Sequence, residues 1–216
     1  MTKIKQFAFN PYQVNSYVVS DDSNECIIID GACSTKEELE RLDNYIKEYG
    51  LTPVLLVNTH AHIDHVVGNH TLCKLYNIPL AAHAECNDFL THALIYAKTF
   101  GVEMEAVKPI DFFLSEDKPV TFGQSSLKVF ETPGHADGSV CFYSAQNSYV
   151  VTGDVLFRES IGRTDLKTGD YDLLQKSIWE KLFTLPDETD VLPGHGPKTT
   201  IGHEKENNPF VAIGME

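Results

Sequence analysis

The sequence of 216 residues predicts an α/β (or α+β) protein in which two β-sheets stack face to face with helices outside. Short apolar runs of strand length alternate with longer amphipathic runs of helical period. This plan of strands, a helix and a further strand occurs twice, in about 1–115 and about 116–216. Acidic and histidine residues follow strands in both halves. We therefore expect one domain, 1–216, with two similar halves.

The first half is expected to begin with three short strands separated by turn residues. Ser34-Thr-Lys-Glu37 then resembles a capping box and predicts the start of a helix. An apolar run, bounded by proline and polar residues, predicts the next buried strand. The expected strands are 3–9, 14–20, 25–31, 53–57 and 78–82, and the expected helices follow residue 34, run from Asp64 to Asn77, and span about 84–100.

The second half starts after a loop expected at 109–114. It is expected to contain more strands than helices, and its last strand leads into a glycine-rich turn. The expected strands lie near 119–122, 127–131, 139–144, 148–152 and 190–192, with one helix at about 171–185.

The charge balance argues against several kinds of partner. Lys and Arg number 17 against 31 Asp and Glu, which gives a net charge of −14. Such a field repels phosphate backbones and anionic membranes, so neither a nucleic acid nor a membrane is expected as partner. A small anionic substrate held by a local cation stays compatible with it.

The cysteines and the N-terminus indicate a cytoplasmic protein. The five cysteines are scattered without a C-x-x-C spacing, as expected of free thiols in a reducing compartment. The N-terminal residues lack the apolar core of a signal peptide, and no apolar run approaches the roughly 18 residues that span a bilayer. We expect a monomer or a small homo-oligomer.

The segment Asn58–Gly68 carries the strongest functional signal. It places His60, His62, Asp64 and His65 within six residues, directly after an apolar strand. His60 and His62 are two apart, so an extended chain can direct both to the same side. Asp64 is expected to cap the helix that follows. One histidine at a strand end is usually a surface residue, but this density of ligand types predicts a metal site.

Three other predicted strand ends carry candidate ligands beside glycine. They are His135 in Thr-Pro-Gly-His, Asp154 in Thr-Gly-Asp and His195 in Pro-Gly-His-Gly. Each motif alone is commoner in plain turns. With the first four they make seven nitrogen and oxygen ligands, more than the four of one tetrahedral zinc. The set fits two divalent metal ions, zinc by default, with iron or manganese as alternatives.

These motifs, Thr-His-Ala-His-Ile-Asp-His together with Thr-Pro-Gly-His, Gly-Asp and Pro-Gly-His-Gly, resemble the metallo-β-lactamase superfamily over nearly the whole chain. The resemblance implies a four-layer αββα sandwich, the metallo-β-lactamase fold. It implies one metal on His60, His62 and His135, and a second on Asp64, His65 and His195. Asp154 would bridge them. Asp30 resembles the carboxylate that orients a ligand histidine in this family, its alternative being a plain turn residue.

Within the superfamily, the chain is most similar to glyoxalase II (hydroxyacylglutathione hydrolase) and its short bacterial relatives. Main-class β-lactamases use a cysteine at the second metal, where this chain has His65 and Asp154. The RNA-processing branch carries an RNA-binding arm, and the flavoprotein branch a flavin domain, that we do not find. The helical domain with which full-length glyoxalase II binds glutathione is also missing, so glutathione recognition stays open. Gly162-Arg163-Thr164-Asp165 resembles persulfide dioxygenases.

The resemblance implies hydrolysis of a small thioester, such as S-lactoylglutathione, by a metal-bridging hydroxide. Asp64 would orient the hydroxide, and with Asp154 it forms the expected catalytic pair. A thiolate leaving group, with a thiol pKa of about 8.5, needs no dedicated general acid, whereas an amide would. Alternatives are a mononuclear-iron persulfide dioxygenase, a lactonase or another small-ester hydrolase, and a silent binding module.

Two further residues are substrate-binding candidates. Arg163 could pair with a substrate carboxylate through its planar guanidinium, or instead pair with Asp165 or Asp170 and shape its loop. His203 lies eight residues after His195 and could reach the same site.

Overall fold

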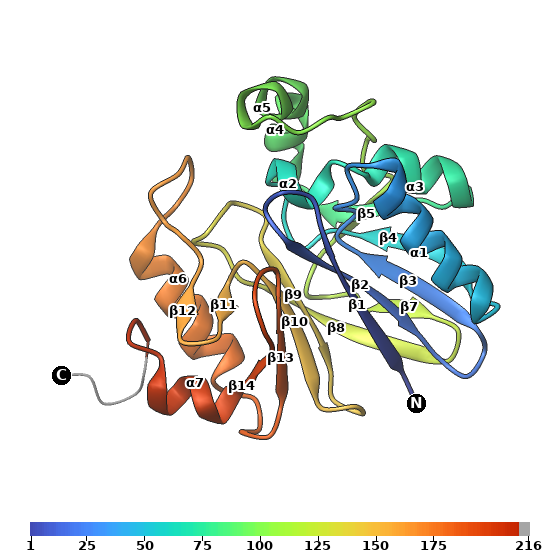
Figure 1. The fold of residues 1–216 in the computed structure, drawn as a ribbon. Helices are drawn as coiled ribbons and strands as arrows, with labels where there is room; N and C mark the ends of the chain where they lie inside the picture. The colour runs from blue at the N-terminus through green and yellow to red at the C-terminus, as the bar shows by residue number, and fades with distance from the viewer. Residues whose placement is uncertain (212–216) are drawn as a thin grey trace.

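A computed structural model describes residues 1–211 and arranges them in four layers: helices, a sheet, a second sheet and helices (Figure 1). Each sheet comes from one continuous part of the chain, the first from residues 3–114 and the second from residues 120–200. The predicted αββα arrangement is therefore confirmed.

The first sheet has the strand order β1-β2-β3-β4-β5-β6. Its first three strands pair antiparallel, and β3 to β6 pair in parallel through helical crossovers. Every residue of β2 is buried, as expected of a strand covered on both faces. The strands are β1 Lys3–Phe9, β2 Val14–Ser20, β3 Glu25–Ile29, β4 Thr52–Val57, β5 Leu80–His83 and β6 Phe112–Leu114.

The second sheet has the strand order β14-β13-β10-β9-β8-β7 and is antiparallel except for the β10–β13 pair. A separate two-stranded hairpin, β11–β12, follows β10. The strands are β7 Val120–Phe122, β8 Ser125–Glu131, β9 Val140–Ser144, β10 Tyr149–Gly153, β11 Leu156–Phe157, β12 Ser160–Ile161, β13 Asp190–Pro193 and β14 Thr199–Thr200.

Helices cover both outer faces and one end of the sandwich (Figure 1). Helices α1 Lys36–Glu48 and α3 Asn69–Tyr76 pack on the first sheet. Helix α6 Tyr171–Ser177, its π-helical continuation η1 Ile178–Leu182, and α7 Ile201–Asn207 pack on the second. Helices α2 Ile63–Val66, α4 Cys86–Thr91 and α5 Ala93–Phe100 form a group with their own apolar cluster. Within residues 1–211, none of the helices is long and apolar enough to cross a membrane.

The core between the sheets explains why they stack. Ile27 and Ile29 of β3 and Val57 of β4 face Val129 of β8 and Phe142 of β9 in one buried cluster. Most of these side chains are fully inaccessible to solvent, and each contributes about 1.5–3 kcal/mol when buried. The period-two alternation that predicted these strands also directs their apolar side chains into this interface.

Several expected boundaries were wrong. Thr35 and Glu38 form the capping box of α1, one residue later than predicted. The helix expected from 64 to 77 is broken at Gly68, whose amide donates to the carbonyl of Gly31 at 2.7 Å. A side chain at Gly68 would collide with Cys33, so the chain must pass close there.

The remaining differences are additions and one reassignment. The helix expected at 84–100 divides at His92 into α4 and α5. Residues 112–114, expected as loop, form the edge strand β6. Strands β11, β12 and β14 and helix α7 were not predicted, because two-residue strands and a polar seven-residue helix have too few positions to show a period.

Candidate metal centre

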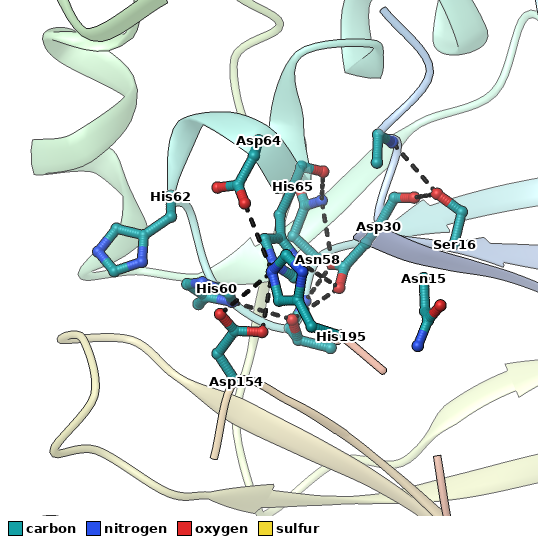
Figure 2. A network of polar contacts seen from close by, with 12 residues as sticks. Asn15, Ser16, Asp30, Asn58, His60, His62, Asp64, His65, Asp154 and His195 are labelled. Carbon is teal, nitrogen blue, oxygen red and sulfur yellow. Dashed lines mark hydrogen bonds and ion pairs between the residues drawn. The ribbon is translucent and has the colours of Figure 1, made fainter. Parts of the chain in front are cut away.

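Seven potential ligand side chains meet where strands of both sheets end. Figure 2 labels all of them except His135. The first sheet supplies the turn after β4 and helix α2, and the second supplies the loops after β8, β10 and β13. Their ligand atoms form three overlapping groups, in each of which all atoms lie within 4.8 Å of one another. The groups are His60, His62 and His135; Asp64, His65 and His195; and His60, His65 and Asp154.

The first group consists of three imidazoles from the two halves of the chain. His62 Nδ1 lies 2.9 Å from His135 Nε2, and the ring of His60 stands edge-on to both others. His60 is buried, and its Nε2 has no hydrogen-bond partner within the described residues. An unpaired buried polar atom is costly, and a cation at this point would remove that cost.

The second group adds carboxylates, and Asp154 joins it to the first. His195 Nε2 lies 3.4 Å from His65 Nε2 and 3.5 Å from Asp64 Oδ2. Asp154 Oδ2 lies 3.5 Å from His195 Nε2 and 3.7 Å from His135 Nε2. Its other oxygen, Oδ1, is 3.3 Å from His65 Nε2 but lacks the geometry of a hydrogen bond. The carboxylate of Asp154 thus lies within reach of both groups.

In four histidines Nδ1, the ring nitrogen that points away from the centre, already has a hydrogen-bond partner, and this fixes their tautomers. The Nδ1–H of His65 donates to Asp30, that of His135 to the carbonyl of Arg163, and that of His195 to the carbonyl of Tyr12. His60 Nδ1 lies 3.1 Å from the Thr59 hydroxyl, which has its own proton committed to Asp30. Each ring therefore directs its Nε2 to the centre as the atom that would bind a metal, and this donor set fits a divalent metal.

Asp30 is the hub behind the second group. It is buried, and its Oδ1 accepts from the Thr59 amide at 2.7 Å. Its Oδ2 accepts from the Thr59 hydroxyl at 2.7 Å and from His65 Nδ1 at 2.9 Å. Asn58 approaches Oδ1 at 3.4 Å, so the turn after β4 is fastened to the end of β3 (Figure 2). The structure thus places Asp30 in contact with a histidine of the candidate centre.

The loop that carries His195 is held by β2 of the opposite sheet. The Asn15 side chain donates to the carbonyls of Pro193 and Gly196, each at 2.9 Å. The buried hydroxyl of Tyr17 donates to Pro193 O at 2.7 Å. These contacts fix the His195 backbone against the half of the chain that supplies Asp64 and His65.

Gly194 is required by close packing. A Cβ on this residue would collide with Asp154 Oδ1 and with Cε1 of His65. Because Gly194 touches both side chains, even the smallest side chain there would displace the carboxylate that joins the two groups.

The electrostatics of the cluster favour a bound cation. Burial lowers the pKa of His60, His62 and His135, the pKa of His62 to about 4, so these imidazoles are neutral at pH 7. Burial also opposes charge on His65, but the carboxylates around it, first Asp154, raise its pKa well above the ordinary value. Burial raises the pKa of Asp154, but His65, His195 and His135 together lower it below its ordinary value. Metal binding would replace the proton on His65.

The centre opens into a cavity of about 420 Å³. Arg163 lines this cavity, but its Nε and Nη2 each lie 2.7 Å from a carboxylate oxygen of Asp165. The side chain of Arg163 is thus paired with Asp165, one of the two partners named in the alternative prediction. His203 is not among the residues that line the cavity, and its Nε2 pairs with Glu159 at 2.9 Å.

One expected role of Asp64 was wrong. His62 occupies the N-cap position of α2, and Asp64 is the second residue of that helix without a capping hydrogen bond. Its carboxylate instead faces His195, where it can contribute to the centre. The Asp64 carboxylate cannot both cap α2 and reach the centre, and in the structure it points to the centre.

Sequence reasoning missed the supporting residues. The Asn69 side chain donates to Asn58 Oδ1 at 2.7 Å. The Thr59 amide donates to the Asp30 carboxylate, and the Ser16 hydroxyl donates to the backbone carbonyl of Asp30. Asn58 and Thr59 lie beside the histidine motif and could have been found by their position. Ser16 and Asn69 sit within an ordinary strand and helix, where the sequence contains no signal.

Proteins of known family match this chain over almost its full length. A family model described as the metallo-beta-lactamase superfamily matches residues 9–195. The chain is 39% identical over 212 residues to a Bacillus subtilis protein named probable metallo-hydrolase YqgX, with 97% of each covered. It is 35% identical over 202 residues to hydroxyacylglutathione hydrolase GloC of Haemophilus influenzae, with 93% of each covered.

Two solved structures are similar in sequence and in fold. The crystal structure of the BLEG-1 B3 metallo-beta-lactamase matches with a TM-score of 0.87 and 37% identity, covering 97% of this chain and 99% of that one. TTHA1623, in a di-iron-bound form, matches with a TM-score of 0.85 and 34% identity, covering 95% and 99%. Both confirm the four-layer fold.

Proposed function

The chain belongs to the metallo-beta-lactamase superfamily, and on that basis we propose that it hydrolyses small thioesters at a centre of two divalent metal ions. S-Lactoylglutathione and related small thioesters are the proposed substrates. The similarity to hydroxyacylglutathione hydrolase GloC supports this substrate class. We further propose zinc as the metal, with iron as an alternative that the di-iron form of TTHA1623 supports.

One observation carries the proposal: two complete donor groups joined by Asp154. His60, His62 and His135 would hold one ion, and Asp64, His65 and His195 the other. When bound, two such ions lower the pKa of water toward about 7 and stabilise negative charge on a carbonyl oxygen. An incomplete second group would instead fit a single ion.

The residues around the centre have roles that follow from their contacts. Asp64 and Asp154 present carboxylate oxygens next to His195, where they can orient water and accept its proton. Asp30 keeps the His65 lone pair directed inward through the hydrogen bond at Nδ1. Asp30, Asp64 and Asp154 would act by orienting His65 or water, so we expect them to be needed for any acyl substrate.

The cavity favours a thioester over an amide. An amide nitrogen must be protonated to leave, whereas a thiol with a pKa of about 8.5 leaves as its anion. Among the described residues that line the cavity, Tyr12 donates its hydroxyl proton to Phe100 O at 2.8 Å. Lys167 is paired with Asp88 at 2.6 Å. Both side chains thus already donate to acceptors of the protein.

The test is hydrolysis by the metal-loaded protein, with metal content measured on the same sample. We expect two ions per chain and turnover of S-lactoylglutathione or of the uncharged thioester S-acetyl-N-acetylcysteamine, with no turnover of the matched N-acetyl amide. Asp154→Ala is expected to lose at least one ion per chain and most of the activity. Two bound ions with normal turnover in that variant would contradict the proposed role of Asp154.

The same samples separate the rival reactions. A β-lactam is included because BLEG-1 is named a B3 metallo-beta-lactamase, and we expect it to be cleaved far more slowly than the thioesters. One iron per chain, with oxygen consumed on a persulfide and no thioester cleaved, would move the function to the dioxygenase suggested by Gly162–Asp165.

A further inference from the structure

We propose, building on the proposed thioester hydrolysis, that the non-reacting part of the substrate is apolar and uncharged. It would lie against a wall of the cavity formed by Phe89, Tyr96, Phe100 and Leu166, here called the apolar wall. This narrows the substrate class from small thioesters in general to those with an aromatic or branched aliphatic group.

The apolar wall begins at the metal centre itself. Phe89 in α4 is buried, and its ring stands edge-on to His62 with centroids 5.4 Å apart. Tyr96 and Phe100 of α5 continue the wall, and Leu166 lines the cavity from the loop before α6. A substrate whose carbonyl reaches the centre therefore places its neighbouring atoms among apolar side chains.

The mouth of the cavity exposes aromatic surface to water. Phe100 is 46% exposed and Tyr12 is 42% exposed, although both line the cavity. The Tyr12 hydroxyl donates to the backbone carbonyl of Phe100 at 2.8 Å, which fixes the two residues to each other. Grouped and exposed aromatic side chains of this kind mark a binding site, because a ligand that covers them removes apolar surface from water.

The cations at the cavity are already paired. Arg163 and Lys167 are the arginine and the lysine among the described residues that line it. Arg163 pairs with Asp165 through two contacts of 2.7 Å, and Lys167 pairs with Asp88 at 2.6 Å. A substrate carboxylate would meet cations whose charge is already balanced by Asp165 and Asp88, whereas an apolar group would displace only water. The two carboxylates of a glutathione moiety therefore gain little from this wall.

The Lys167–Asp88 pair also sets the shape of the cavity. It links the loop after β12 to helix α4, and the amide of Asp137 donates to the Thr168 hydroxyl of the same loop at 3.0 Å. The loop and the helix are thus joined beside the cavity, whose volume of about 420 Å³ lies in the range of small-ligand sites.

The experiment compares matched probes on the zinc-loaded protein. We expect kcat/KM for S-phenylacetyl-N-acetylcysteamine to exceed that for S-acetyl-N-acetylcysteamine and for S-lactoylglutathione by at least about tenfold. The thioethers S-phenethyl- and S-ethyl-N-acetylcysteamine, which cannot be hydrolysed, report binding alone by calorimetry. We expect the phenethyl compound to bind at least about tenfold more tightly.

Two variants assign the preference to the apolar wall. Phe100→Ala is expected to reduce two ratios by about threefold or more. One is the kcat/KM ratio of S-phenylacetyl- to S-acetyl-N-acetylcysteamine, and the other is the affinity ratio of the phenethyl to the ethyl thioether. The matched control is Phe113→Ala, which removes a phenyl ring that is 63% exposed on β6 and does not line the cavity. This control is expected to leave both ratios unchanged.

The outcomes separate this inference from the proposed reaction. If the protein hydrolyses thioesters without preferring apolar ones, or hydrolyses S-lactoylglutathione fastest, the inference is overturned and the proposed reaction still holds. If no thioester is cleaved but the phenethyl thioether still binds more tightly and Phe100→Ala removes that preference, the reaction fails and the apolar wall stands. Equal binding of the two thioethers would overturn the inference whatever is hydrolysed.

Discussion

Asp30→Asn tests how the second donor group is built, because it changes one charge and almost no volume. The carboxylate Oδ2 accepts from the Thr59 hydroxyl and from His65 Nδ1. An amide keeps one oxygen, which stays with the Thr59 backbone amide, and places an NH₂ group where Oδ2 was. That NH₂ group cannot accept the proton of His65 Nδ1.

The expected result is a change of tautomer at His65. With no acceptor at Nδ1, the ring moves its proton to Nε2, which then points into the centre and cannot bind a metal. Losing such an outer partner costs about 10- to 100-fold in metal affinity, or about 1.4–2.7 kcal/mol. The metal-free protein should also unfold more easily by about 2–4 kcal/mol, because two hydrogen bonds to a buried charge are lost.

The assay is zinc binding by competition with a chromophoric chelator, together with urea unfolding of the metal-free protein. We expect the zinc affinity of the second group to fall more than that of the first, because His65 contacts Asp30 directly, whereas His60 is linked to it only through the Thr59 hydroxyl.

Asp21→Asn is the matched control for this assay. Asp21 is also buried and accepts several hydrogen bonds, but from Ser23, Gln124 and Ser125, away from the centre. It should lose stability and keep both zinc affinities. Unchanged zinc affinities in Asp30→Asn would refute the argument that Asp30 directs His65.

Three further predictions follow from the described contacts. Gly194→Ala should lose bound zinc and at least about tenfold in turnover, because its Cβ would collide with Asp154 Oδ1 and His65 Cε1; normal zinc content and turnover in this variant would contradict the packing argument. Burial raises the pKa of Asp21, but its hydrogen bonds lower it to about 2, so it stabilises the fold above about pH 4 and stops doing so as the pH falls toward 2. The urea-unfolding difference between wild type and Asp21→Asn should therefore shrink by on the order of 2 kcal/mol from pH 6 to pH 2, and a constant difference would count against it. Removal of metal with EDTA should lower the calorimetric Tm by about 5–15 °C, reversed by zinc; an unchanged Tm would show that the ions do not stabilise the folded state.

The strands of the two sheets could be predicted well because they are short apolar runs or alternate apolar and polar residues with period two. Strand β2 and strand β8, for example, were expected within two residues of their observed ends. The break at Gly68 could not be predicted, because its cause is the approach of residue 31, far away in the chain. Edge strand β6 was missed since three residues, two of them exposed, carry no alternation.

The candidate site was predicted through its donor atoms and not through their supports. His60, His62 and His65 stand together in one motif, and His135 and His195 each follow a glycine at a strand end. The structure brings all of these side chains together with Asp64 and Asp154. The paired state of Arg163 depends on which carboxylate its loop brings near, and spacing alone left both Asp165 and Asp170 open.

The division of the chain into two successive sheets has a consequence for synthesis on the ribosome. The first sheet is complete once residue 114 has emerged, whereas its partner ends near residue 200. Until then the inner face of the first sheet, with Ile27, Ile29 and Val57, has nothing to pack against. At about 5–20 residues per second, this face stays open for several seconds, long enough for chaperones to bind it. Growth conditions that slow elongation should therefore raise aggregation of the nascent chain more than they affect the finished protein.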